Sequence, residues 1–287
     1  MDVAYENGAA LVRTGCFEPR HIFENGQAFR FFPCGANAYE GVAHGRYLRV
    51  EKVPEGARLY PCTQQDFERV WKRYFDLERD YAALFSDCGD SVLKQGMQYG
   101  CGLRLLNQEP FETLISFIVS ANNHVKRIRG ILRRICALYG EPFSFEGKTW
   151  HRFPAPAILA GLSEEALGEC GSGYRAPYIK GAARMAAEGF SLEALRGMGY
   201  ADAKKELQRL PGVGPKVADC VRCSPLASTM RSRPMYGSGG CCVSNMDLQG
   251  TTGKFMSSRG NALGRTRGLR SNTCFSGSGK TAKADFV

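Results

Sequence analysis

The side chain best suited to chemistry in this sequence is Lys216, which follows a turn with two glycines. The segment Leu210–Lys216 reads LPGVGPK. A lysine amine with a free lone pair can attack the anomeric carbon of a sugar and form a Schiff base. Backbone N–H groups of Gly212, Val213 and Gly214 at the start of a helix can bind a phosphate. The segment therefore predicts a nucleophile beside a phosphate site, with a plain turn between two helices as the alternative.

Two helices must position this turn, and helical spacing of apolar residues recurs throughout residues 109–221. The pattern predicts an all-helical unit with helices over Phe111–Ala121, Val125–Ile135, Arg175–Glu188 and Tyr200–Leu210, and a short one starting at Ser163. The turn at 210–216 then joins two helices as a helix-hairpin-helix motif.

The preceding residues, 1–108, have a different pattern. Phe29–Phe32 and Tyr47–Val50 are short apolar stretches among turn formers, which is typical of an antiparallel sheet. Thr63 and Asp66 have the spacing of a helix start. We therefore expect an α+β fold: an N-terminal antiparallel sheet domain with helices, then the helical domain, and an irregular tail over 222–287.

The tail carries most of the net charge of the 287-residue chain. Residues 222–287 hold ten Lys and Arg against two Asp, which is +8 of the total of +10. They also hold ten Gly and ten Ser with no helical or strand period. Such a composition buries too little apolar surface to offset the entropy of ordering. We expect a disordered basic tail, and the overall charge says little about the folded part.

Cysteine, histidine and hydropathy patterns bear on metals and membranes. The twelve cysteines and four histidines lack the spacing of a metal or iron–sulfur site, so we expect reduced thiols, no metal and no cofactor. No stretch of eighteen apolar residues and no signal-peptide pattern occurs. These features favour a cytoplasmic monomer without membrane contact, or a nuclear one in a eukaryote.

Four motifs, in order, resemble the 8-oxoguanine DNA glycosylase/AP lyase family of helix-hairpin-helix glycosylases. Gly26–Arg30 reads GQAFR, Ser120–Arg127 reads SANNHVKR, Gly173–Ala176 reads GYRA, and Leu210–Cys220 reads LPGVGPKVADC. His124 stands where the family has a third asparagine. The resemblance covers about residues 20–221.

The resemblance implies a role for each matched residue. Lys216 would be the nucleophile, and Cys220 and the carbonyl of Gly26 would line the lesion pocket. The DNA-binding residues would be Asn122 and Asn123 in the gap left by the extruded base, Arg127 and Arg175 at the orphaned cytosine, Tyr174 as a wedge, and Gly212, Val213 and Gly214 at a phosphate. Base extrusion needs such polar and aromatic groups to fill the stack. The implied partner is double-stranded DNA containing oxidised guanine.

One expected group is missing. The family has a catalytic aspartate in a Pro-x-Asp-Val segment some twenty residues beyond the nucleophile, and no such segment follows Lys216. Asp219 is only three residues on, and Asp247 lies in the irregular tail. Reading the tail one base out of frame allows Asp-Val-Trp at Met235–Gly237. We hypothesise that residues from about 222 onward are a frameshift product, which would impair catalysis.

Two other functions stay open. A non-catalytic DNA-binding protein would use the hairpin and the basic tail without lesion preference. A related glycosylase would act on a different lesion, because pocket residues expected near the C-terminus cannot be identified in the tail.

Overall fold

The structure, a computed structural model, describes residues 2–81, 96 and 98–223. All of these residues belong to one compact unit. The predicted disordered tail, 222–287, lies outside the described residues from 224 onward. The predicted domain boundary at residues 108 and 109 stays a prediction.

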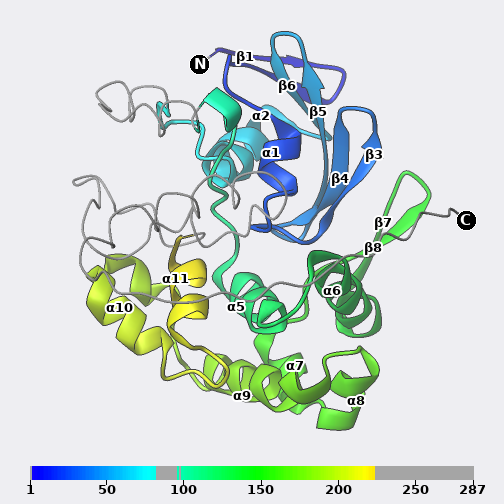
Figure 1. Cartoon of the computed structure of the whole chain (residues 1–287). Helices are drawn as coiled ribbons and strands as arrows, with labels where there is room; N and C mark the ends of the chain where they lie inside the picture. The colour runs from blue at the N-terminus through cyan, green and yellow to red at the C-terminus, as the bar shows by residue number, and fades with distance from the viewer. Residues whose placement is uncertain (1, 82–95, 97, 224–287) are drawn as a thin grey trace, which may run out of the picture. The chain divides into compact units, whose positions relative to one another are not determined.

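The N-terminal part is built on a six-stranded sheet in which every neighbouring pair is antiparallel. The strands lie in the order β1-β2-β6-β5-β4-β3, as Figure 1 shows in blue. Their bounds are β1 Asp2–Glu6, β2 Ala9–Arg13, β3 Phe31–Gly35, β4 Ala38–Ala43, β5 Arg46–Val53 and β6 Gly56–Tyr60. The predicted antiparallel sheet is confirmed, and β1 and β2 are additional strands.

Tight turns with positive φ at two successive residues join two of these strand pairs. Asn7 and Gly8 connect β1 to β2 with φ of 51° and 72°, and His44 and Gly45 connect β4 to β5 with φ of 50° and 64°. This geometry matches the right-handed twist of antiparallel strands, and glycine adopts it without steric cost. The turns therefore fix the register of both hairpins.

The predicted strand at 29–32 begins two residues later than expected. Phe29 and Arg30 precede β3, because their side chains reach the helical part instead of alternating across the sheet. The helix start at Thr63 is confirmed as a capping box with Asp66. The N-terminal helical segments are α1 Pro19–Phe23, α2 Gln64–Asp66, a π-helical turn Phe67–Trp71, and α3 Lys72–Tyr74.

The second part is mainly helical, as predicted. Its α-helices are α5 Pro110–Ser120, α6 Val125–Tyr139, α7 Pro156–Gly161, α8 Glu164–Glu169, α9 Ala176–Ala187, α10 Tyr200–Leu207 and α11 Pro215–Cys223; its 3₁₀ turns are Gly173–Arg175 and Ala194–Gly197. Ser163 caps α8 by accepting from the backbone of Ala166 at 3.1 Å. Each part has its own apolar core.

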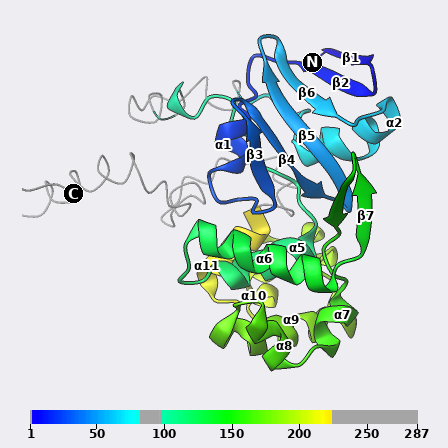
Figure 2. The same cartoon turned by 90° about the vertical axis from the view of Figure 1, so that its right-hand side faces the viewer.

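The helical part also contains a hairpin that an all-helical prediction omits. Strands β7 Pro142–Phe145 and β8 Lys148–His151 are joined by Glu146 and Gly147, with φ of 48° and 72°. Phe145 stacks on Tyr47 of β5 with ring centroids 4.4 Å apart. The hairpin thus packs against the N-terminal sheet, and Figure 2 shows it beside β5. A two-residue turn and a partner ring explain why these residues form strands.

Candidate active site

The predicted helix-hairpin-helix motif is formed by α10 and α11. At Gly212, φ is +76°, and an added Cβ would lie 2.7 Å from the Cβ of Tyr178 on α9, so only glycine fits. Val213 is buried, and its N–H donates to the carbonyl of Leu210 at 3.1 Å. An added Cβ at Gly214 would meet no atom within 4 Å. Gly214 and the start of α11 therefore form the open face of the turn.

Lys216 lies in the first turn of α11, directly after Pro215, and its side chain is exposed. Cys220 follows one helical turn later and is half-buried. Burial raises the pKa of the Cys220 thiol, and the Lys216 ammonium acts against that rise. The predicted nucleophile and the predicted pocket cysteine therefore share one face of α11, and the thiol stays protonated at neutral pH.

Asp219, the first carboxylate after Lys216, is used to join the two helices of the motif. Its carboxylate accepts a hydrogen bond from the Tyr200 hydroxyl and one from Lys204 Nζ at 2.7 Å, both on α10. The acidic partner raises the pKa of Tyr200 and of Lys204. Asp219 therefore holds α10 against α11.

The asparagine-rich segment forms the turn between α5 and α6. Asn122 is exposed and has φ of +49°, a left-handed conformation that asparagine tolerates better than most residues. Asn123 Nδ2 donates to the carbonyl of Val119 at 3.1 Å, which caps the end of α5. His124 Nδ1 accepts from the N–H of Arg127 at 3.3 Å and caps the start of α6. His124 can thus replace an asparagine, because the turn needs an acceptor there.

Tyr174 and Arg175 meet this turn although they lie about fifty residues further along the chain. Arg175 Nε donates to the carbonyl of Ala121, and Nη2 to that of Asn122, each at 3.1 Å. The Tyr174 ring lies over the Arg175 guanidinium, with 4.3 Å from Cζ to the ring centroid, and is 59% exposed. Two predicted motifs therefore form one surface on which Asn122 and Tyr174 are accessible.

The two predicted cytosine-contacting arginines have different environments. Arg175 is 3% exposed and binds the backbone of the turn, so it holds Asn122 in place. Arg127 is exposed on the first turn of α6. The sequence does not distinguish the two, because which face of a segment is buried depends on the partner element.

Gly26 lies in the loop after α1, with φ of +83° and no atom within 4 Å of an added Cβ. Its neighbour Phe29 is buried in the helical core and packs against Phe117 of α5, with ring centroids 6.0 Å apart. Helix α11 packs on α5 in that same core. Phe29 is a connecting residue that the sequence analysis did not single out, although it is part of the GQAFR segment.

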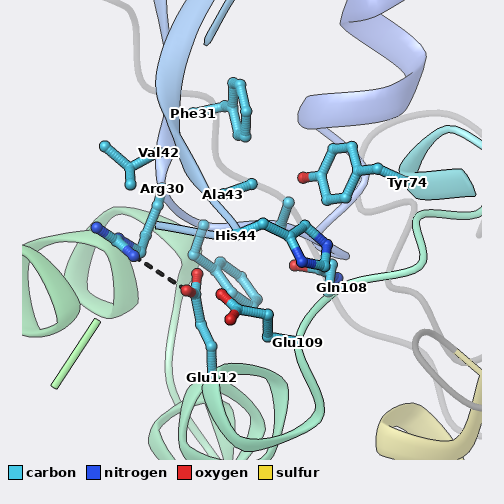
Figure 3. A pocket seen from close by; sticks show the side chains of 11 residues that line it. Arg30, Phe31, Val42, Ala43, His44, Tyr74, Gln108, Glu109 and Glu112 are labelled. Carbon is cyan, nitrogen blue, oxygen red and sulfur yellow. Dashed lines mark hydrogen bonds and ion pairs between the residues drawn. The ribbon is translucent and has the colours of Figure 1, made fainter. Parts of the chain in front are cut away.

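A crevice where the sheet meets α5 contains a cluster of charged groups (Figure 3). Arg30 Nη1 lies 3.0 Å from a Glu112 carboxylate oxygen, and His44 and Glu109 line the same crevice. Burial raises the pKa of Glu112 and of Glu109, while Arg30 opposes both rises. Burial lowers the pKa of His44. None of the site residues predicted from the sequence lines this crevice, so we regard it as a structural joint.

No group of three or more His, Cys, Asp or Glu among the described residues could hold a metal ion. No helix among them is long and apolar enough to cross a membrane.

Two family models cover most of the chain. The 8-oxoguanine DNA glycosylase N-terminal domain matches residues 10–114. The HhH-GPD superfamily base excision DNA repair protein matches residues 115–264. The chain therefore belongs to the HhH-GPD superfamily of base-excision DNA repair proteins and, within it, to the 8-oxoguanine DNA glycosylase family.

Individual relatives agree with this family. A probable N-glycosylase/DNA lyase of Methanothermobacter thermautotrophicus is 38% identical over 51% of this chain and 54% of its own length. The N-glycosylase/DNA lyase OGG1 of Arabidopsis thaliana is 32% identical over 69% of this chain and 58% of its own length. The chain thus spans between half and three fifths of the length of these curated relatives.

A solved structure shares the fold. The Clostridium acetobutylicum 8-oxoguanine glycosylase/lyase, in complex with double-stranded DNA containing cytosine opposite 8-oxoG, superposes with a TM-score of 0.76. It is 33% identical, and the match covers 79% of each chain.

Proposed function

We propose that this chain is a base-excision-repair DNA glycosylase with AP lyase activity that acts on 8-oxoguanine in duplex DNA, in the nucleoid or the nucleus. The main support is the shared surface of Asn122 and Tyr174, which Arg175 holds together. Extruding a base costs a few kcal/mol of unstacking, which polar and aromatic groups that enter the stack can offset.

In this proposal Lys216 carries the chemistry. Its amine attacks C1′ of the sugar and the oxidised base leaves, so one C–N bond forms as another breaks. Ring opening gives a Schiff base, which acidifies the C2′ proton; loss of that proton expels the 3′ phosphate by β-elimination. The open face at Gly214 would bind a neighbouring phosphate through backbone amides. Arg127, exposed on α6, would contact the orphaned cytosine.

Borohydride trapping tests this function, because it reduces the Schiff base to a stable adduct. We expect the chain with its reading frame restored after residue 221 to form an adduct with a duplex containing 8-oxoguanine opposite cytosine, and to lose it in Lys216→Gln. Removing an enzyme's nucleophile costs about 10³-fold or more. Lys205→Gln, an exposed lysine on α10, is the matched control and should trap normally. An adduct that persists in Lys216→Gln would refute the assigned nucleophile.

We further propose that the chain as written is impaired, because residues from about 222 onward are out of frame. Asp219 supports this, since it is bonded to Tyr200 and Lys204 and does not replace the absent aspartate. The superfamily match continues past residue 222, to residue 264, and so does not mark a change of frame at that position. Sequencing of the coding DNA is therefore the decisive measurement. If sequencing across codon 221 finds no reading frame that encodes Asp-Val-Trp, this proposal is wrong. A frame-restored chain that traps more adduct than the chain as written would support it.

The same use of Asp219 also favours a second function for the chain as written, non-catalytic DNA binding. It predicts salt-sensitive DNA binding without lesion preference. It also predicts that Lys216→Gln does not change this binding. Equal affinity for 8-oxoguanine and guanine duplexes would support it. A related glycosylase for another lesion would instead prefer a different modified base in the same titration.

A further inference from the structure

Gln27, the residue after Gly26, is a buried side chain whose polar atoms all bind backbone groups. It is 2% exposed. Its Nε2 donates to the carbonyl of Ile22 at 2.9 Å and to that of Arg104 at 2.8 Å. Its Oε1 accepts from the N–H of Leu106 at 3.1 Å. One amide thus joins the end of α1 to the segment that leads into α5.

The main chain of Gln27 is held as firmly as its side chain. Its carbonyl accepts from Gln108 Nε2 at 2.6 Å, and its N–H donates to Asn25 Oδ1 at 3.0 Å. The Gln27 N–H belongs to the same peptide group as the Gly26 carbonyl, and Gly26 has open space where a side chain would be. The peptide of Gly26 therefore has little freedom to move.

The following residues connect the same loop to the helical part. Phe29 enters the core that contains α5 and α11. Arg30 pairs with Glu112 of α5 and also donates to the carbonyl of His151 on β8. The loop around Gly26 is thus bound on one side to the N-terminal part and on the other to the helices that present Lys216.

We propose that Gln27 is a positioning residue that sets how well the chain distinguishes an oxidised purine from a normal one. This inference rests on the proposed function and on the role that the family resemblance implies for Gly26, whose carbonyl would accept a hydrogen bond from the extra N–H of the oxidised base. That N–H is a single hydrogen-bond donor. A small displacement of the carbonyl therefore weakens the one hydrogen bond that distinguishes the oxidised base. Gln27 acts through Gly26 and touches no substrate atom itself.

Fluorescence anisotropy of the full chain with three duplexes tests the inference. Each has cytosine opposite the variable position, which is 8-oxoguanine, guanine, or a tetrahydrofuran abasic analogue. Binding is measured instead of turnover, so the missing aspartate does not affect the result. We expect Gln27→Met to reduce the preference for 8-oxoguanine over guanine by about 10- to 100-fold. Affinity for the abasic analogue, which offers no base to read, should be retained.

Asn107→Leu is the matched control. Asn107 is a buried amide in the same segment, and its Nδ2 donates to the carbonyl of Arg73 at 2.7 Å, away from the Gly26 loop. This variant loses one side-chain hydrogen bond to the backbone, against three in Gln27→Met, and should keep the preference. If circular dichroism shows that Gln27→Met does not fold, Gln108→Met is the second variant. It removes the hydrogen bond from Gln108 Nε2 to the Gln27 carbonyl and leaves the Gln27 side chain in place. It should shift the preference in the same direction by a smaller factor.

The outcomes separate the inference from the proposed function. A wild-type chain without preference for 8-oxoguanine overturns the proposed function, and the inference with it. A wild-type preference that the folded Gln27→Met and Gln108→Met variants retain overturns the inference alone. Equal losses on the abasic and 8-oxoguanine duplexes also overturn it, because they indicate general damage to the fold.

Discussion

Two buried arginines, one in each part of the molecule, have contrasting environments. Arg30 has an ion pair with Glu112 and a carbonyl acceptor on β8. Arg222, at the end of α11, is 6% exposed, and within the described part of the chain its Nε and Nη1 have no hydrogen-bond partner. Burial lowers the pKa of Arg222, whose Cζ lies 5.1 Å from the centroid of the Tyr200 ring.

The two arginines differ in how fully their buried N–H groups are hydrogen-bonded. A buried guanidinium is tolerated when its N–H groups are satisfied and costly when they are not. Arg222 has two unpartnered buried groups, Nε and Nη1, whereas Arg129 and Arg196 each have one within the described residues. Arg222 is the first residue of the segment for which we propose a frameshift.

Removing Arg30 should produce the largest effect. Arg30→Met leaves the buried Glu112 carboxylate unpaired, which typically costs about 3–5 kcal/mol. Urea unfolding followed by circular dichroism measures it. The double variant Arg30→Met/Glu112→Leu should recover most of the loss. A loss below about 1 kcal/mol in the single variant would contradict the description of Arg30 as a satisfied joint.

The same substitution at the other arginine should have the opposite sign. Arg222→Met removes unsatisfied buried donors and should stabilise the chain by about 1–3 kcal/mol. The measurement is the same urea titration. Destabilisation instead would mean that Arg222 is a native part of α11, and it would weaken the frameshift proposal.

A smaller loss is expected where α10 meets α11. Tyr200→Phe removes the hydroxyl that donates to Asp219 but keeps the ring under Arg222. One such hydrogen bond contributes about 1 kcal/mol. Thermal unfolding should show a modest decrease in melting temperature, and an unchanged value would show that the Tyr200 hydroxyl does not help to hold Asp219.

The smallest effect should be a change in pH dependence at the joint. Burial lowers the pKa of His44 below its ordinary value of 6.5. Its stabilising contribution is therefore present above that value and lost as the pH falls through the lowered pKa. Raised pKa values act oppositely for Glu109 and Glu112, whose contribution is lost as the pH rises.

His44→Asn should accordingly lose less stability between about pH 7.5 and about pH 5.5 than the wild type does. Asparagine suits the left-handed φ at this position. Unfolding free energies at the two pH values give the comparison, and identical losses in both proteins would exclude His44 as the group responsible.

Local signals explain what could be predicted from the sequence. The cap at Thr63, the cap at Ser163 and the apolar spacing of α5 and α6 are local, and the structure confirms them. The strands β1 and β2 had a local signal as well, since Asn7-Gly8 is a strong hairpin turn. The flanking segments are only five residues each, so their alternation is a weak signal.

Other features depend on tertiary contacts and have no local signal. Phe29 and Arg30 continue an apolar alternation into β3, yet they bind the helical part. Arg175 and Arg127 are alike in sequence, but only Arg175 is buried by the turn at Ala121. For the candidate site, the motifs predicted which segments matter, and the structure shows which side chains of those segments are accessible.

The hairpin β7–β8 has a consequence for how DNA would be handled. Phe145 and Trp150 pack against Tyr47, and Arg152 Nε donates to the carbonyl of Gly45 at 3.2 Å. The helical part therefore contacts the sheet at a second place besides α5. Hinge opening would have to break both attachments. We therefore expect the protein, on binding duplex DNA as proposed, to present a preformed surface.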